Sequence, residues 1–307
     1  MHHGLKILLF GRSGQVGWEL QRSLSTLGEL ICLDKYSTPY CGDLSNLAEL
    51  AKTVRNIKPH IIVNAAAYTA VDKAQSEPEL AHTINALAPG VLAEEAQRLD
   101  AYLVHYSTDY VFDGGGQHRW KETDTPAPLN IYGQTKLQGE QHIIGTCQKY
   151  LIFRTSWVYA ARGNNFAKTI LRLAKEREQL TVINDQIGTP TGADMLADVT
   201  AYTIRHVIKH PEHMGLYHLT ARGETSWYHY AQFIVDYARR IGMTLKADAE
   251  KIAAVPSSAF QTQAIRPQNS KLDTTKLQSI FNLALPHWQQ GVERMLDEIF
   301  DLKKQIV

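Results

Sequence analysis

Over the first half of the chain, short apolar runs alternate with longer segments in which apolar residues recur at helical spacing. This alternation predicts βαβ units and therefore a parallel sheet. Strands are predicted over residues 5–10, 30–34, 61–64, 102–107 and 150–155. Helices are predicted between them over residues 15–27, 44–57, 79–99 and 130–148. The pattern is typical of the α/β class and of a Rossmann-like, doubly wound parallel sheet.

The second half of the chain is less regular. Helices are predicted over residues 165–177, 193–209, 227–241 and 288–302, one strand over 216–220, and irregular structure over 255–272. We therefore expect residues 1–155 to form the Rossmann domain. Residues 156–307 are expected to form a smaller C-terminal substrate-binding lobe that is partly interleaved with the first.

Composition excludes several classes of partner. The chain has 307 residues, of which 44% are hydrophobic, and a formal net charge of +1. This balance argues against nucleic acid or an anionic membrane as a partner, and no apolar run is long enough to span a bilayer. Three cysteines without CxxC spacing are typical of a reducing compartment, so we expect a cytoplasmic protein. We assign no role to His2 and His3.

A glycine-rich turn joins the first predicted strand to the first helix. Glycines let the backbone approach a pyrophosphate closely, and the helix start supplies free N–H groups. The spacing is G-x-x-G-x-x-G, and the alternative is a tight turn that binds nothing. The predicted phosphate-binding residues are Gly11, Ser13, Gly14, Gln15, Val16 and Gly17.

Asp34 closes the second predicted strand, where a carboxylate can accept hydrogen bonds from an adenosine ribose. Lys35 and Arg12 are close in sequence and could instead neutralise a 2′-phosphate. The choice between NAD and NADP therefore stays open. Asp43 and Leu44 are expected to border the adenine. Ala65, Ala66 and Ala67 follow the third strand, and their small side chains are expected to let the cofactor lie against the strand ends.

Tyr132 and Lys136 are four residues apart in a predicted helix and so share a face. A lysine ammonium near a phenol favours the phenolate, so the pair could shuttle a proton. Ser107 and Thr108 end the fourth predicted strand, where a hydroxyl could bind a substrate carbonyl. The residues alone do not separate these two hydroxyls. Trp157, just after the fifth strand, could stack on a sugar or belong to the core.

These motifs resemble those of the extended short-chain dehydrogenase/reductases and, within them, of the dTDP-4-dehydrorhamnose reductase family. The more specific segments are Ala70-Val71-Asp72 and Arg266-Pro267-Gln268-Asn269-Ser270. The resemblance covers essentially the whole chain. It implies reduction of the C4 keto group of dTDP-4-dehydro-β-L-rhamnose by NADPH or NADH, the last step of dTDP-L-rhamnose synthesis.

The resemblance also implies roles for individual residues. Thr108, Tyr132 and Lys136 match the catalytic triad, which selects Thr108 over Ser107 by analogy. The family often has an acid at Gln75, a departure expected to affect packing only. Arg266 is a candidate for the diphosphate, with a structural ion pair as its alternative. The expected substrate-binding residues are Thr69, Val71, Thr108, Asp109, Trp157, Asn165 and Arg266.

Some members of that family dimerise through a magnesium ion held by acids. Glu19 and Asp194 could correspond, with Asp297 or Glu298 nearby, so a homodimer with bound magnesium is one alternative. Two other functions stay open on the same fold. One is a nucleotide-sugar epimerase or dehydratase, and the other is a cofactor-binding regulatory subunit without activity. Retention of Thr108, Tyr132 and Lys136 argues against the last.

Overall fold

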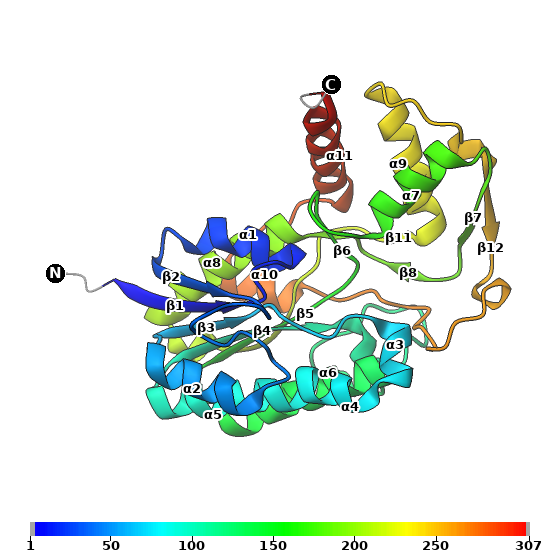
Figure 1. Ribbon diagram of the computed structural model, residues 1–307. Helices are drawn as coiled ribbons and strands as arrows, with labels where there is room; N and C mark the ends of the chain where they lie inside the picture. Colours follow the sequence, from blue (N-terminus) through cyan, green and yellow to red (C-terminus); the bar gives the residue numbers. More distant parts are fainter. Residues whose placement is uncertain (1–3, 305–307) are drawn as a thin grey trace.

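Six parallel strands form the central sheet in the order β2-β1-β3-β4-β5-β10 (Figure 1). The computed structural model describes residues 4–304, so His2 and His3 lie outside the described residues. The order changes direction between β1 and β3, which is where a doubly wound sheet opens its ligand crevice. The strands are β1 (Leu5–Phe10), β2 (Gly28–Leu33), β3 (Ile61–Asn64), β4 (Tyr102–Thr108), β5 (Tyr150–Thr155) and β10 (Gly215–His218).

Helices cover both faces of this sheet because strand side chains alternate between the faces. Ile7 and Leu9 join one apolar core, and Leu8 and Phe10 join the other. One layer contains α1 (Gln15–Leu24), α8 (Ala193–Lys209) and α10 (Thr275–Phe281). The opposite layer contains α2 (Leu47–Ile57), α5 (Ala88–Leu99) and α6 (Ile131–Thr146). Figure 1 shows the sheet between these layers, which confirms the Rossmann-like α/β fold.

Most predicted elements are present with shifted ends. The α2 helix begins three residues later than predicted because the Asn46 side chain accepts a hydrogen bond from the Glu49 backbone and caps it. The helix predicted over 79–99 is a continuous series of α4 (Pro78–His82), a π-helical turn (Thr83–Leu87) and α5. The short helix α3 (Val71–Ser76) was not predicted.

The smaller lobe has its own apolar core, formed mainly by three helices, α7 (Phe166–Glu176), α9 (Trp227–Arg240) and α11 (Trp288–Lys304). Three pairs of short strands connect and flank them. The pairs are β6 (Val158–Tyr159) with β9 (Thr191–Gly192), β7 (Leu180–Ile183) with β12 (Ile252–Val255), and β8 (Ile187–Gly188) with β11 (Thr225–Ser226).

Three elements from the second half of the sequence belong to the main sheet and its helical layer. Strand β10 pairs with β5, and α8 packs on α1. Helix α10 contributes Leu277 and Phe281 to the core on the face of the sheet that α1 and α8 cover. The exact division at residue 155 stays a prediction. None of the helices described between residues 4 and 304 combines the length and apolar character needed to cross a bilayer.

Candidate active site

The turn between β1 and α1 places backbone against the switch point of the sheet. Gly11 has φ = 86°, and a Cβ there would lie 2.7 Å from the Ala66 nitrogen. A Cβ on Gly17 would lie 2.0 Å from the Gly11 carbonyl oxygen, so this position in the first turn of α1 requires glycine. No side chain caps α1. Its first N–H groups are therefore available to an anion.

A cleft of about 540 Å³ runs along this turn and over the ends of the strands. The structure places nearly every predicted cofactor residue on its wall. Gly17 is the exception, because it packs beneath the turn against Gly11. The predicted residues that line the cleft are Gly11, Ser13, Gly14, Gln15, Val16, Asp34, Asp43, Leu44, Ala65, Ala66, Ala67, Tyr132 and Lys136.

Part of the cleft wall was not predicted from the sequence. Ser107, one of the two candidate hydroxyls, lines the cleft, but so do Tyr106 beside it on β4 and Val158 in β6, which were not predicted. Gly163 and Asn164 come from the loop before α7, so the smaller lobe closes one side of the cleft. No local pattern marks Val158, Gly163 or Asn164, because they reach the cleft only through the packing of the two lobes.

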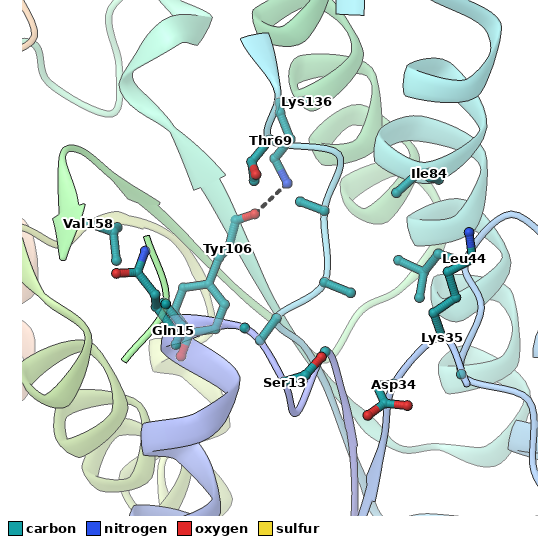
Figure 2. Close-up of a pocket in the computed structure, with 18 of the residues that line it drawn as sticks. Ser13, Gln15, Asp34, Lys35, Leu44, Thr69, Ile84, Tyr106, Lys136 and Val158 are labelled. Atoms are coloured by element: carbon teal, nitrogen blue, oxygen red, sulfur yellow. Dashed lines mark hydrogen bonds between the residues drawn. The ribbon is translucent and has the colours of Figure 1, made fainter. Parts of the chain in front are cut away.

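One end of the cleft carries both signs of charge (Figure 2). Arg12 donates from Nε to Asp34 Oδ2 at 2.8 Å, and this hydrogen bond is the main reason that the Asp34 pKa is lowered. Lys35 lines the same end. A ribose hydroxyl and a 2′-phosphate would each find a complementary group here, so the structure fits both forms of the cofactor.

At the other end, α6 carries the predicted catalytic pair. Asn130 caps α6 by accepting from the Gly133 backbone, which fixes where the helix begins. Both Tyr132 and Lys136 face the cleft. Burial raises the Tyr132 pKa to about 12, and a hydrogen bond with Thr108 partly offsets this rise. Burial and the charge of Asp109 raise this pKa and Lys136 does not lower it, so the expected effect of the lysine on the phenol is absent in the chain by itself.

Lys136 is buried against the end of β4. Its Nζ donates to the Tyr106 carbonyl oxygen at 2.6 Å, drawn as the dashed line in Figure 2, and lies 3.0 Å from His105 Nε2. Burial lowers the Lys136 pKa to about 8, against the opposing charge of Glu140. The lysine can therefore exchange its proton close to neutral pH.

The two hydroxyls at the end of β4 differ in their partners. Thr108 Oγ1 donates to Asp109 Oδ1 at 3.0 Å and accepts from the Tyr110 backbone. Within residues 4–304, Ser107 Oγ has no hydrogen-bond partner, and Ser107 lines the cleft. Burial raises the Asp109 pKa to about 6, while the hydroxyls of Ser270 and Thr108 oppose that rise.

A second cavity, of about 980 Å³, lies between the lobes and contains Arg266. Arg266 donates from Nη2 to Asp72 Oδ2 at 2.6 Å, so the ion pair considered as its alternative role is present. Tyr110 also lines this cavity, and its ring meets the Tyr132 ring edge-on at 5.7 Å between centroids. The second cavity therefore approaches the predicted proton donor.

The other predicted substrate residues are dispersed. Thr69 lines the cofactor cleft, and Val71 begins α3. Trp157 has φ = 49° and stacks on Trp227 with 3.5 Å between ring centroids. Asn165 caps α7 and also donates to Gln15 Oε1 at 2.9 Å, so it ties the two lobes together.

The acids considered for magnesium do not form a site in one chain. Asp194 pairs with Arg294 at 3.0 Å, and Asp297 accepts from the Tyr237 hydroxyl. Burial raises the pKa of Glu19. In the described part of the chain, no group of three or more His, Cys, Asp or Glu side chains is placed to hold a metal ion. We therefore assign no chemistry to magnesium.

Comparisons with known proteins agree with this geometry. The family described as the RmlD substrate binding domain matches residues 5–300. The dTDP-4-dehydrorhamnose reductase of Escherichia coli K12 is 58% identical over 296 residues, covering 96% of this chain and 98% of that protein. The chain belongs to this reductase family. Because the chain belongs to this family, the reductase chemistry is expected in the cleft that contains Tyr132 and Lys136.

Solved structures agree as well. The NADP complex of the Bacillus anthracis Ames dTDP-4-dehydrorhamnose reductase superposes with a TM-score of 0.85 at 36% identity, covering 96% of this chain and 99% of that one. The Thermus thermophilus UDP-glucose 4-epimerase bound to NAD gives 0.77 at 17% identity, covering 95% and 98%. At 17% identity, the likeness to the epimerase shows only that the two proteins share a fold.

Proposed function

We propose that this chain reduces the C4 keto group of dTDP-4-dehydro-β-L-rhamnose to give dTDP-β-L-rhamnose. The observation that carries the proposal is the placement of Tyr132 and Lys136 on one wall of the cleft that begins at the phosphate-binding turn. Membership of the reductase family supports the choice of reaction and substrate.

The cleft fits a nicotinamide dinucleotide. The α1 N-terminus and the backbone from Gly11 to Val16 would hold the pyrophosphate, and Asp34, Arg12 and Lys35 would face the adenosine ribose. Lys136, at the opposite end, would hold the nicotinamide ribose. When bound, NADPH or NADH supplies the hydride that is added to the substrate carbon.

Tyr132 would give its phenolic proton to the oxygen that becomes negative as the carbonyl is reduced. A neutral phenol is the required form, and burial keeps Tyr132 protonated well above neutral pH. Thr108 would hydrogen-bond the same oxygen and orient it toward Tyr132. In the chain alone its one hydrogen goes to Asp109 Oδ1, so the hydroxyl would have to turn this hydrogen from Asp109 to the substrate oxygen.

The nucleotide portion of the substrate would occupy the cavity between the lobes. This cavity combines aromatic walls from Phe166 and Trp227 with polar groups such as Gln186 and Arg266. Aromatic faces suit a pyrimidine base, and a guanidinium suits a diphosphate. Asp72 would share Arg266 with the diphosphate and keep the guanidinium aimed along the cavity wall.

The direct test is oxidation of NADPH and NADH at 340 nm with dTDP-4-dehydrorhamnose generated from dTDP-glucose by coupling enzymes. We expect oxidation that requires both this protein and that substrate, with dTDP-rhamnose as the product. If folded protein binds the cofactor and oxidises neither form, the named substrate is wrong. Tightly held cofactor that is never released would instead favour an epimerase.

A further inference from the structure

The loop between β6 and α7, residues 160–165, closes one side of the cofactor cleft. Gly163 and Asn164 from this loop line the cleft. A Cβ on Gly163 would lie 3.2 Å from Gln15 Cγ, so the loop backbone rests on the first residue of α1. The N–H groups at this end of α1 are the ones proposed to hold the pyrophosphate. The 160–165 loop therefore lies beside the proposed pyrophosphate site.

Two contacts fasten the 160–165 loop to one face of α1. Asn165 Nδ2 donates to Gln15 Oε1 at 2.9 Å. The guanidinium carbon of Arg162 lies 3.8 Å from the centre of the Trp18 ring, which is the geometry of a cation–π contact. Gln15 and Trp18 are three residues apart on the helix and so share a face. The loop is therefore held at Arg162 and at Asn165, and its two cleft-lining residues lie between these points.

The two fastening contacts differ in what else their residues do. Asn165 also caps α7 and donates to the Ala160 carbonyl oxygen at 2.7 Å, and Gln15 itself lines the cleft. The cleft wall, as residues 4–304 form it, includes neither Arg162 nor Trp18. Trp18 is 45% exposed, so its ring does not belong to the apolar core either. The Arg162–Trp18 contact therefore acts on the position of the loop alone.

A contact of this kind has a recognisable effect on ligand binding. Because neither residue lines the cleft, the contact stabilises the closed loop by the same amount with or without a bound cofactor. A binding equilibrium responds only to interactions that differ between its two states, so the dissociation constant changes little. Entry and exit of a ligand past this side of the cleft both require the loop to move. The contact therefore slows both steps.

We propose that the Arg162–Trp18 contact fastens the 160–165 loop over the cofactor and sets the rates at which NADPH or NADH enters and the oxidised form leaves. Arg162 and Trp18 are positioning residues that act through the loop. The inference rests on the proposed function in assigning the cleft to a nicotinamide dinucleotide. A reductase exchanges its cofactor in every turnover, so the rate of loop opening is an upper limit on the rate of turnover.

The first test is stopped-flow binding of NADPH to the whole chain, followed by the fluorescence of the nicotinamide and without any sugar nucleotide. Arg162→Ala and Trp18→Leu should each raise the association and dissociation rate constants by about three- to tenfold, the effect of losing one partly exposed cation–π contact. The dissociation constant should stay within about twofold of the parent value, because Asn165 still holds the loop. Rate constants equal to those of the parent chain would overturn the proposal.

The double variant separates this fastening from a direct contact of Arg162 with the phosphates of the cofactor. If the two residues form one contact, Arg162→Ala has no further effect on either rate constant in the Trp18→Leu background. A further rise of the NADPH dissociation constant there would show that Arg162 binds phosphate, and the fastening role would be wrong. Trp18→Phe keeps a ring and Arg162→Lys keeps the charge, so both should return the rate constants toward the parent values.

Arg240 supplies a matched control, because its guanidinium carbon lies 5.0 Å from the centre of the Tyr237 ring on α9, and neither residue is part of the described cleft wall. Arg240→Ala should leave both rate constants unchanged, and an equal acceleration would refute a specific role for Arg162. The measurements need no turnover. A chain that binds NADPH but does not reduce the sugar would refute the proposed substrate alone, whereas a chain that binds neither cofactor would overturn both proposals.

Discussion

At the scale of single residues, the site brings together three titratable groups whose burial disfavours their charged forms. The pKa of Asp109 is raised to about 6, that of Lys136 is lowered to about 8, and that of Tyr132 is raised to about 12. Loss of hydration is the first cause in each case. The three groups therefore change charge in separate pH ranges, and the tyrosine keeps its proton throughout the neutral range.

Asp109 gives a prediction about stability. Its pKa is about 6 in the folded chain against a usual value of 3.8, so the folded state binds the proton more tightly. The stability that this proton adds is complete below pH 3.8 and is lost as the pH rises through about 6, a loss of roughly 3 kcal/mol. In Asp109→Asn this loss is absent.

Urea unfolding of both proteins from pH 4 to pH 7.5 measures the difference. We expect the stability advantage of Asp109→Asn over the parent chain to grow by roughly 2–3 kcal/mol across that range. An advantage that stays constant would mean that the carboxyl has an ordinary pKa in the folded chain.

Single residues also show what could and could not be read from the sequence. The motifs located the β1–α1 turn, Asp34 and the Tyr132–Lys136 pair, all of which line the cleft, because each lies beside an element whose direction is set by local periodicity. The contact between His105 and Lys136 was missed because a histidine inside an apolar strand looks like core. Asn64, whose Nδ2 lies 3.1 Å from His105 Nδ1, is on a different strand, and only the sheet brings the two together.

At the scale of elements, the β1–α1 turn depends on Gly17. A Cβ there would overlap the Gly11 carbonyl, whereas a Cβ on Gly145 of α6 meets nothing within 4 Å. We expect Gly17→Ala to lower the free energy of unfolding by more than about 2 kcal/mol. It should also weaken NADPH binding, because the turn must move.

Gly145→Ala is the matched control. The same change in an open helical position should raise the free energy of unfolding by about 0.5–1 kcal/mol through helix propensity. Denaturant unfolding and NADPH titration by fluorescence measure both variants. Equal effects of the two substitutions would contradict the close packing at Gly17.

The long elements were predictable and the short ones were not. Residues 5–10, 61–64 and 193–209 form elements with the predicted ends. The two-residue strands β6, β8, β9 and β11 have no periodicity to detect, since each pairs with a segment far along the chain. These short strands position Trp157 and the loop before α7. Trp157 was a candidate from the sequence, but its stacking on Trp227 and the cleft residues Gly163 and Asn164 were beyond local pattern.

At the scale of the whole molecule, the site is built where two lobes meet. The Arg266–Asp72 ion pair and the Asn165–Gln15 hydrogen bond each join a residue before position 155 to one after it. The cofactor cleft and the second cavity lie on either side of the Tyr110–Tyr132 ring contact. Correct placement of the two lobes is therefore a condition for bringing a hydride donor and a nucleotide sugar together.

Arg266 tests whether the second cavity binds the substrate. Arg266→Gln should raise the KM for dTDP-4-dehydrorhamnose by at least about tenfold, because a diphosphate loses a guanidinium, and should leave the KM for NADPH unchanged. Asp72→Asn breaks the same ion pair but keeps the cation, so its effect on the sugar KM should be smaller. Equal losses in both variants would show that Arg266 serves only the ion pair.

The central claim is that Tyr132 supplies the proton in the reduction. Its most direct test is Tyr132→Phe, with turnover and NADPH affinity measured on the same preparation. The account predicts a fall in kcat of about 10²–10⁴, because general acid catalysis contributes that much, and an NADPH dissociation constant close to that of the parent chain. Turnover within about a factor of ten of the parent chain would contradict it.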